Sequence, residues 1–347
     1  MKTNPFFILH ASGRDDEKTI LKKAKETELL YGISTAKEQN ELFHPTGRIK
    51  AEIGYLPDIP EESIDRVREY LLAQDSDSKT LPDPMPDYMP KAGPARMNGA
   101  AAILSAWQIG DVISAEAACL SLVKLCDETT AKDSLEQINA DREAAGIAPL
   151  KDTYMVRDIL KSRKSKLLKE LADRIRGLPP ALYRELRHNL AVHFCDKESP
   201  YFRSLHLDQL VTRHLSAPLE AEKEWEKKRI EAYAGRCREL ADQKKIETRH
   251  LKQLSDQVTL LLEALNDWDQ LTGPDRMIAR GKGFTAGGSD EMYDMIHELF
   301  LDIVHDGNLK NATRIICCMV DIFTDVSTQK RDLVKMKKDL LMKKKGI

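Results

Sequence analysis

The residue types that could do chemistry gather in one stretch of the sequence, where four histidines and a cysteine are potential metal ligands: His188, His193, Cys195, His206 and His214. Their spacing argues against a site, because His188 and His193 are five residues apart and would not share a helical face as the histidines of a His-x-x-x-His pair do. No carboxylate pattern completes a catalytic zinc motif. We therefore expect ordinary surface or core histidines and assign no metal ligand. A cryptic metal-dependent enzyme using this stretch is kept as an alternative hypothesis.

A glycine-containing stretch, Arg280-Gly281-Lys282-Gly283-Phe284, could wrap a phosphate group with backbone N–H groups. It lacks the full Walker spacing and follows no predicted strand, so we interpret it as a connection between helices. No Ser, His and Asp arrangement stands out elsewhere, although such triads are recognised by geometry and not by sequence. The sequence therefore predicts no catalytic residue and no cofactor, and favours a non-enzymatic protein.

Two basic segments are the remaining candidates for binding a partner. Lys22, Lys23 and Lys25 lie on one predicted helix, and the segment 330–345 contains eight Lys or Arg and two Asp, a local charge of +6. The whole chain has 54 basic and 56 acidic residues, and its net charge of −2 creates no field that would draw it to nucleic acid or an acidic membrane. An electrostatic partner must therefore recognise a local patch.

The composition predicts an all-α fold. Charged residues make up 32% of the 347 residues and aromatic residues only 6%, a balance typical of helical bundles and coiled coils. A chain of this length commonly forms two or three domains. The six cysteines include no Cys-x-x-Cys pair and favour reduced thiols, and no uncharged run is long enough to span a bilayer. We therefore expect a soluble, cytoplasmic protein.

Apolar periodicity and turn residues predict the order of the helices. Between 75 and 94 five prolines lie among Asp and Ser residues, which predicts a semi-rigid linker. Helices are expected before this linker at 15–31, 36–43, 48–56 and 61–72, and after it at 98–126 with a break near Gly110, 131–145, 153–176, 180–194, 290–305, 309–323 and the basic C-terminal segment.

A heptad pattern is the most regular feature of the sequence. Apolar residues alternate in steps of three and four between Ile230 and Trp268, and only Lys244 and Glu247 interrupt them. The pattern predicts either one continuous helix or a hairpin that folds back at the polar positions. The apolar stripe can be buried within its own chain or can join two copies in a homodimer, and both alternatives remain open.

The N-terminal region resembles a known family. Asn4-Pro5-Phe6-Phe7-Ile8-Leu9, the basic helix 16–31 and the block 42–57, together with the stretches 138–146 and 264–269, are similar to a group of bacterial degenerate J-domain-like (DnaJ-related) proteins. The block 42–57 resembles that group's Asn-Pro-Arg-x-Arg-Leu-x-x-Glu-Ile-x-Trp-Leu-Pro pattern. The resemblance implies a small helical head whose basic helix, with Lys22, Lys23 and Lys25, binds an Hsp70-type chaperone.

The His-Pro-Asp signature with which J-domains stimulate the Hsp70 ATPase is absent after the basic helix. His44-Pro45-Thr46 is not a displaced copy, since it lies thirteen residues beyond Tyr31, where that helix ends. The resemblance therefore implies docking without the usual stimulation, and fold-level analogy alone is a weak guide to function.

These observations divide the chain into five expected segments: a J-like module (1–74), a proline-rich linker (75–95), a helical domain (96–215), a heptad-bearing helix or hairpin (216–270) and C-terminal helices with a basic tail (271–347). We expect a scaffold or co-chaperone-like adaptor that binds other proteins. The alternative, a subunit of a stress-response or phage-defence assembly, would use the basic tail to contact nucleic acid.

Overall fold

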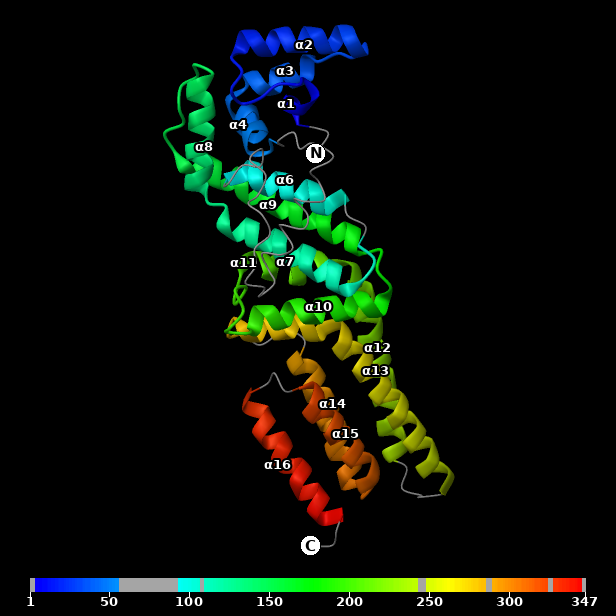
Figure 1. Cartoon of the computed structure of the whole chain (residues 1–347). Helices are drawn as coiled ribbons and strands as arrows, with labels where there is room; N and C mark the ends of the chain where they lie inside the picture. Colours follow the sequence, from blue (N-terminus) through cyan, green and yellow to red (C-terminus); the bar gives the residue numbers. More distant parts are fainter. Residues whose placement is uncertain are drawn as a thin grey trace. The chain divides into compact units, whose positions relative to one another are not determined.

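The regular structure of the chain is helical. A computed structural model describes residues 4–55, 93–106, 109–242, 248–284, 289–323 and 327–344 (Figure 1). No strand occurs in these ranges, so the predicted all-α fold is confirmed for the described part of the chain. The chain divides into two compact units, unit 1 with Met1–Leu186 and Ser204–Leu210, and unit 2 with Arg187–Arg203 and Val211–Ile347.

Unit 1 begins with four helices, α1 (Pro5–Ile8), α2 (Glu17–Tyr31), α3 (Ala36–Phe43) and α4 (Pro45–Ile53). Local residues set the ends of α2. The Asp16 carboxylate accepts a hydrogen bond from the Thr19 N–H at 2.7 Å, and Gly32 ends the helix at φ 64°, a left-handed conformation that glycine adopts without steric cost. Apolar residues of all four helices meet in a small core that includes Phe6, Ile20 and Leu42.

The start of α4 differs from the prediction. We expected a turn at 44–47 and a helix from Arg48, but the helix already begins at Pro45. A proline is tolerated in the first turn because its missing N–H has no intrahelical partner there. The helix predicted at 61–72 lies outside the described residues.

The rest of unit 1 is built around α9, which packs against α4, α6, α7 and α8. Unit 1 also contains α10 up to Leu186 and the short α11. The bounds of these helices are α6 (Gly93–Ala106), α7 (Val112–Glu128), α8 (Ala131–Ala144), α9 (Thr153–Ile175), α10 (Pro180–Cys195) and α11 (Leu205–Asp208).

Buried ion pairs connect the N-terminal helices to this bundle. The Glu52 carboxylate accepts hydrogen bonds from Arg48 on its own helix and from Arg142 on α8, with donor–acceptor distances of 3.0 and 3.1 Å. The Asn98 amide on α6 donates to the Ile53 carbonyl at 2.7 Å. The structure therefore groups residues 4–55 with α6, α8 and α9, where the sequence suggested a separate 1–74 module. Helix α6 also begins within the expected 75–95 linker, whose earlier residues lie outside the described ranges.

Unit 2 continues from the C-terminal half of α10. Its core is formed mainly by α12, α13, α14, α15 and α16. The bounds of its elements are η2, a π-helix (Gln209–Leu215, of which Gln209 and Leu210 fall in unit 1), η3, a 3-10 turn (Ala217–Leu219), α12 (Glu220–Ala241), α13 (Thr248–Gly281), α14 (Ser289–His305), α15 (Leu309–Ile322) and α16 (Ser327–Lys344).

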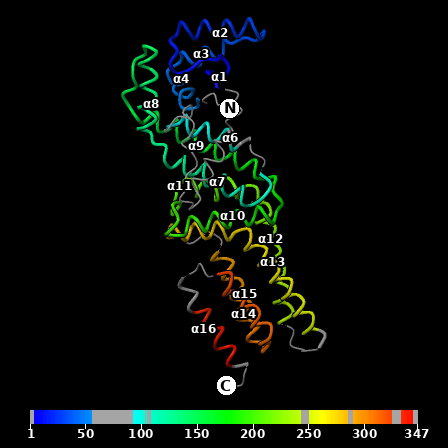
Figure 2. Tube along the Cα trace, in the orientation of Figure 1, coloured from blue at the N-terminus to red at the C-terminus, as the bar shows by residue number. Residues whose placement is uncertain are grey.

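The heptad segment forms a hairpin. Helices α12 and α13 run side by side (Figures 1 and 2), which decides between the two forms that the pattern allowed. Ile230, Cys237, Val258, Leu261 and Leu265 are fully buried in the core of unit 2. These seam residues therefore pack within one chain, and a homodimer, which stays a hypothesis, would need another surface.

Helix α13 also continues past the end expected for it. We expected the helix to end near 270, before Thr272-Gly273-Pro274, but it extends through Pro274 to Gly281. A proline inside a helix disturbs the carbonyls of the preceding turn. Arg187, which is fully buried, donates to the Leu271 carbonyl at 2.8 Å and to both carboxylate oxygens of Asp275 at 3.0 Å. Arg187 therefore binds polar groups on both sides of the proline.

None of the helices in the described ranges has both the length and the apolar content needed to cross a membrane.

Candidate functional site

Helix α2 presents one face to the core of unit 1 and another to solvent. Ile20, Ala24 and Thr27, at helical spacing, are buried. Lys22 and Lys25 lie on the exposed side, where the Lys22 side chain is 76% exposed and its ammonium is 3.7 Å from the Glu26 carboxylate. Two of the three lysines predicted to bind a partner are therefore accessible.

Lys23 is placed differently from the other two. Its ammonium donates to the Asp15 carboxylate at 2.8 Å, and its side chain is 32% exposed. Asp15 in turn accepts from the Ser12 N–H at 2.7 Å, so this pair belongs to the turn that precedes α2. Lys23 therefore also stabilises this turn, and its role in binding a partner stays a prediction.

The sequence analysis missed a group of exposed apolar residues at the C-terminal end of α2. Leu29 is 85% exposed, Leu30 75% and Tyr31 60%, and Ile33 directly after the helix is also exposed. The signal was present, because Leu29 and Leu30 fall outside the buried stripe of Ile20, Ala24 and Thr27. We call the exposed residues Leu21, Lys22, Lys25, Leu29, Leu30, Tyr31 and Ile33 the α2 surface.

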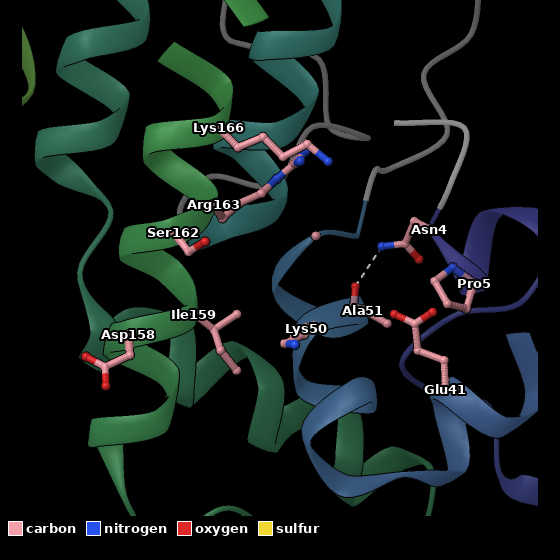
Figure 3. A pocket seen from close by; sticks show the side chains of 11 residues that line it. Asn4, Pro5, Glu41, Lys50, Ala51, Asp158, Ile159, Ser162, Arg163 and Lys166 are labelled. Carbon is pink, nitrogen blue, oxygen red and sulfur yellow. Dashed lines mark hydrogen bonds between the residues drawn. The ribbon is translucent and has the colours of Figure 1, made fainter. Parts of the chain in front are cut away.

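A pocket of about 420 Å³ opens between the N-terminal helices of unit 1 and α9 (Figure 3). Lys50 of α4 lines one side, and Ser162, Arg163 and Lys166 of α9 line the other. Asn4 also lines it and holds the α1 end in place, since its amide donates to the Ala51 carbonyl at 2.9 Å. The pocket thus combines three cations, two neutral polar side chains and the carboxylates of Glu41 and Asp158, from segments far apart in the sequence.

The Arg163 guanidinium is positioned by a chain of hydrogen bonds. Its Nε donates to the Asn98 side-chain oxygen at 2.8 Å, and the Asn98 amide donates to the carbonyls of Ile53 and Tyr55 at 2.7 and 2.9 Å. Burial lowers the pKa of Arg163 from its ordinary value, because desolvation disfavours the charged form. The guanidinium still titrates far above neutral pH and remains a cation.

Lys164, the next residue of α9, points into the interior of unit 1. Its ammonium donates to the carbonyls of Cys126 and Thr129, the latter at 2.6 Å, at the C-terminal end of α7. A cation at a helix C-terminus interacts favourably with the carbonyl dipoles. Burial nevertheless lowers the pKa of Lys164 and raises the pKa of the neighbouring Cys126 thiol to about 12.

The residues considered as metal ligands are not assembled into a site in the described ranges, where no group of three or more His, Cys, Asp or Glu side chains is placed to hold a metal ion. His193 lies 3.4 Å from the Ser199 hydroxyl, and Cys195 donates to the Met277 carbonyl at 3.2 Å. His206, in unit 1, is 2.5 Å from the Asp127 carboxylate. His188 is exposed and His214 is buried.

The glycine-containing stretch at 280–284 lies at the end of one helix, and the basic C-terminal segment lies in another. Arg280 and Gly281 complete α13, and a Cβ at Gly281 would lie 3.0 Å from the Phe194 ring, so this glycine allows close packing. The basic tail forms α16, whose Leu333 and Leu340 are buried in the core of unit 2, while Lys335 and Lys338 are exposed.

Comparison with protein-family models, with curated proteins and with solved structures finds no match for this chain. The similarity to J-domain-like proteins therefore stays a prediction. The connection between α2, the helix predicted to be the basic helix, and α3 spans 32–35. His44 and Pro45 begin α4.

Proposed function

We propose that this chain is a non-enzymatic adaptor that docks onto an Hsp70-type chaperone through the α2 surface. The single observation that supports the proposal most strongly is the exposure of Leu29 one helical turn beyond Lys25, on the same face of α2, with Leu30 and Tyr31 also exposed in the last turn. Large apolar side chains grouped on a surface commonly mark a binding site for another protein.

The composition of the α2 surface indicates which kind of partner fits. Lysines in the middle of the helix favour an acidic surface and increase the rate of encounter, whereas the apolar residues at its end supply area that can be buried. The resemblance to J-domain-like proteins implies an Hsp70-type partner bound through this same helix. Because Gly32-Ile33-Ser34-Thr35 stands where His-Pro-Asp would be, we expect binding without the usual stimulation of ATP hydrolysis.

The test is calorimetric titration of the full chain with the purified Hsp70-type chaperone of the same organism. We expect Leu29→Ser, and separately Lys22→Glu, to weaken binding about tenfold or more, since loss of an interface anchor costs more than ~1 kcal/mol. These side chains are exposed, so the far-UV circular dichroism of the variants should match that of the wild type.

Lys132→Glu is a matched control. Lys132 is an exposed lysine of unit 1 whose ammonium is 3.8 Å from Glu136 one turn along α8, just as Lys22 is 3.7 Å from Glu26 along α2. The two substitutions change the net charge equally and break equivalent surface pairs. If Lys132→Glu and Lys22→Glu weakened binding equally, the effect would come from the net charge of the chain and not from the α2 surface. If the wild-type chain did not bind the chaperone, the proposal would be wrong.

A further inference from the structure

The pocket between α4 and α9 contains three cations that form no ion pair with the described residues. Elsewhere in unit 1, Arg14, Lys23, Arg48 and Arg142 each form an ion pair with a carboxylate at 2.8 to 3.0 Å. Within the described ranges Lys50, Arg163 and Lys166 form none, although all three line the same pocket. Positive charge held together in this way raises the local concentration of anions.

The geometry directs two of these cations toward the same place. Arg163 and Lys166 are three residues apart on α9 and therefore share a face of the helix. In Figure 3 their charged ends point toward one another at one end of the pocket, whereas the Asp158 carboxylate points away from them. Glu41 lines the opposite side, beside Pro5. One end of the pocket is therefore lined by hydrogen-bond donors and cations.

Arg163 is also prepared for an anion before one binds. Its Nε is already occupied by Asn98 at 2.8 Å, which fixes the plane of the guanidinium, while its two Nη groups form no hydrogen bond with the described residues. The guanidinium is partly desolvated, and no described carboxylate forms an ion pair with it. The charge of Glu170, further along α9, offsets only part of the cost, since the pKa of Arg163 is still lowered. An anion that accepted two hydrogen bonds from the Nη groups would offset the cost of desolvating the guanidinium.

We propose that this pocket binds the phosphate group of a small phosphate monoester. Arg163 would hold two phosphate oxygens, Lys166 and Lys50 would neutralise the dianion, and the Ser162 hydroxyl would donate a further hydrogen bond. A volume of about 420 Å³ suits a small molecule and not only a free ion. Glu41, at the other side, can accept hydrogen bonds from hydroxyl groups on the rest of the ligand.

The experiment is calorimetric titration of the full chain at constant ionic strength with three probes: inorganic phosphate, glycerol 3-phosphate and glycerol. We expect saturable binding of both phosphates, tighter for the monoester, and none of glycerol. Lys166→Gln and Arg163→Gln should each weaken binding by about tenfold to a hundredfold, since a hydrogen bond to a charged group contributes about 1.5–3 kcal/mol. Binding of inorganic phosphate as tight as that of the monoester would show a site for the free ion and contradict the monoester.

Lys169→Gln is the matched control, because Lys169 is an exposed lysine one turn further along α9 that does not line the pocket. It removes the same charge and should leave the affinity within about twofold of wild type, in keeping with the small effect of a distant, screened surface charge. Arg163→Lys, which keeps the charge but loses the planar fork, should bind more weakly than wild type.

Three results would overturn the inference: no saturable heat with either phosphate, unchanged affinity in Lys166→Gln, or equal loss in Lys166→Gln and Lys169→Gln. The outcome is independent of the docking proposal. The pocket residues and the α2 surface share no side chain, so failure of one leaves the other unaffected.

Discussion

Lys164 shows how a single buried charge links the stability of unit 1 to pH. Burial lowers its pKa below the ordinary value of 10.5, so the folded protein releases this proton at a lower pH than the unfolded chain does. Between the two pKa values the unfolded state binds more protons, and the free energy of unfolding therefore rises with pH. Below both values the cost of burying the ammonium is fully present, and above both it is absent.

We accordingly expect the free energy of unfolding of the wild type, measured by urea denaturation from neutral pH to about 10.5, to rise more steeply with pH than that of Lys164→Met. The variant has no group to titrate at this position. Lys169→Met, on the exposed face of α9, should keep the wild-type pH dependence. Identical slopes for the wild type and Lys164→Met would show that folding does not lower the pKa of Lys164 appreciably.

At the scale of the element, the junction between α3 and α4 depends on the absence of a side chain. A Cβ at Gly47 would lie 2.2 Å from the Glu41 carbonyl oxygen, a backbone atom that cannot move without shifting α3. Gly235, inside α12, has no atom within 4 Å of the corresponding position. Two glycines in helices therefore have opposite roles, one required by a close backbone approach and one not.

We expect Gly47→Ala to lower the free energy of unfolding by about 1–3 kcal/mol, the usual cost of overpacking. Gly235→Ala should raise it by up to ~1 kcal/mol because alanine has the higher helix propensity. Thermal or urea denaturation of both variants measures the difference. Stabilisation by both substitutions would show that α3 and α4 can separate without cost.

The helices also show how far the sequence predicts the fold. The end of α2 at Gly32 and the bounds of α3 agree with the prediction, because capping and periodicity are local. The helix was expected to end near 270, but α13 continues through Pro274, beside which Arg187, a residue distant in sequence, binds Leu271 and Asp275. The candidate sites differ in the same way. The exposed lysines of α2 could be predicted from the pattern of one helix. The pocket forms only where α4 and α9 pack together, and no local sequence pattern specifies that contact.

For the whole molecule, the heptad pattern predicted an apolar seam but not its partner. The seam residues are buried against α14 and α15 as well as within the hairpin, so they build the core of unit 2. Periodicity reports that a helix face is covered and does not say by which segment. The division into units was equally inaccessible, because it follows from long-range contacts such as that between Glu52 and Arg142.

Two units with separate cores should unfold in separate transitions. We expect differential scanning calorimetry of the full chain to resolve two, each assigned by a substitution in one core. Glu52→Gln leaves Arg48 and Arg142 buried without a carboxylate and should destabilise unit 1 by about 3–5 kcal/mol. Leu265→Ala removes a fully buried side chain and should destabilise unit 2 by about 2–5 kcal/mol.

The assignment depends on each substitution lowering the temperature of one transition only. Glu136→Gln, which breaks an exposed pair of α8 in unit 1, is the control for Glu52→Gln and should change neither transition appreciably, since surface pairs contribute about 0–1 kcal/mol. A single transition that Glu52→Gln and Leu265→Ala lower alike would mean that the two cores unfold as one cooperative structure. The chain continues from one unit to the other within both α10, between Leu186 and Arg187, and η2, between Leu210 and Val211.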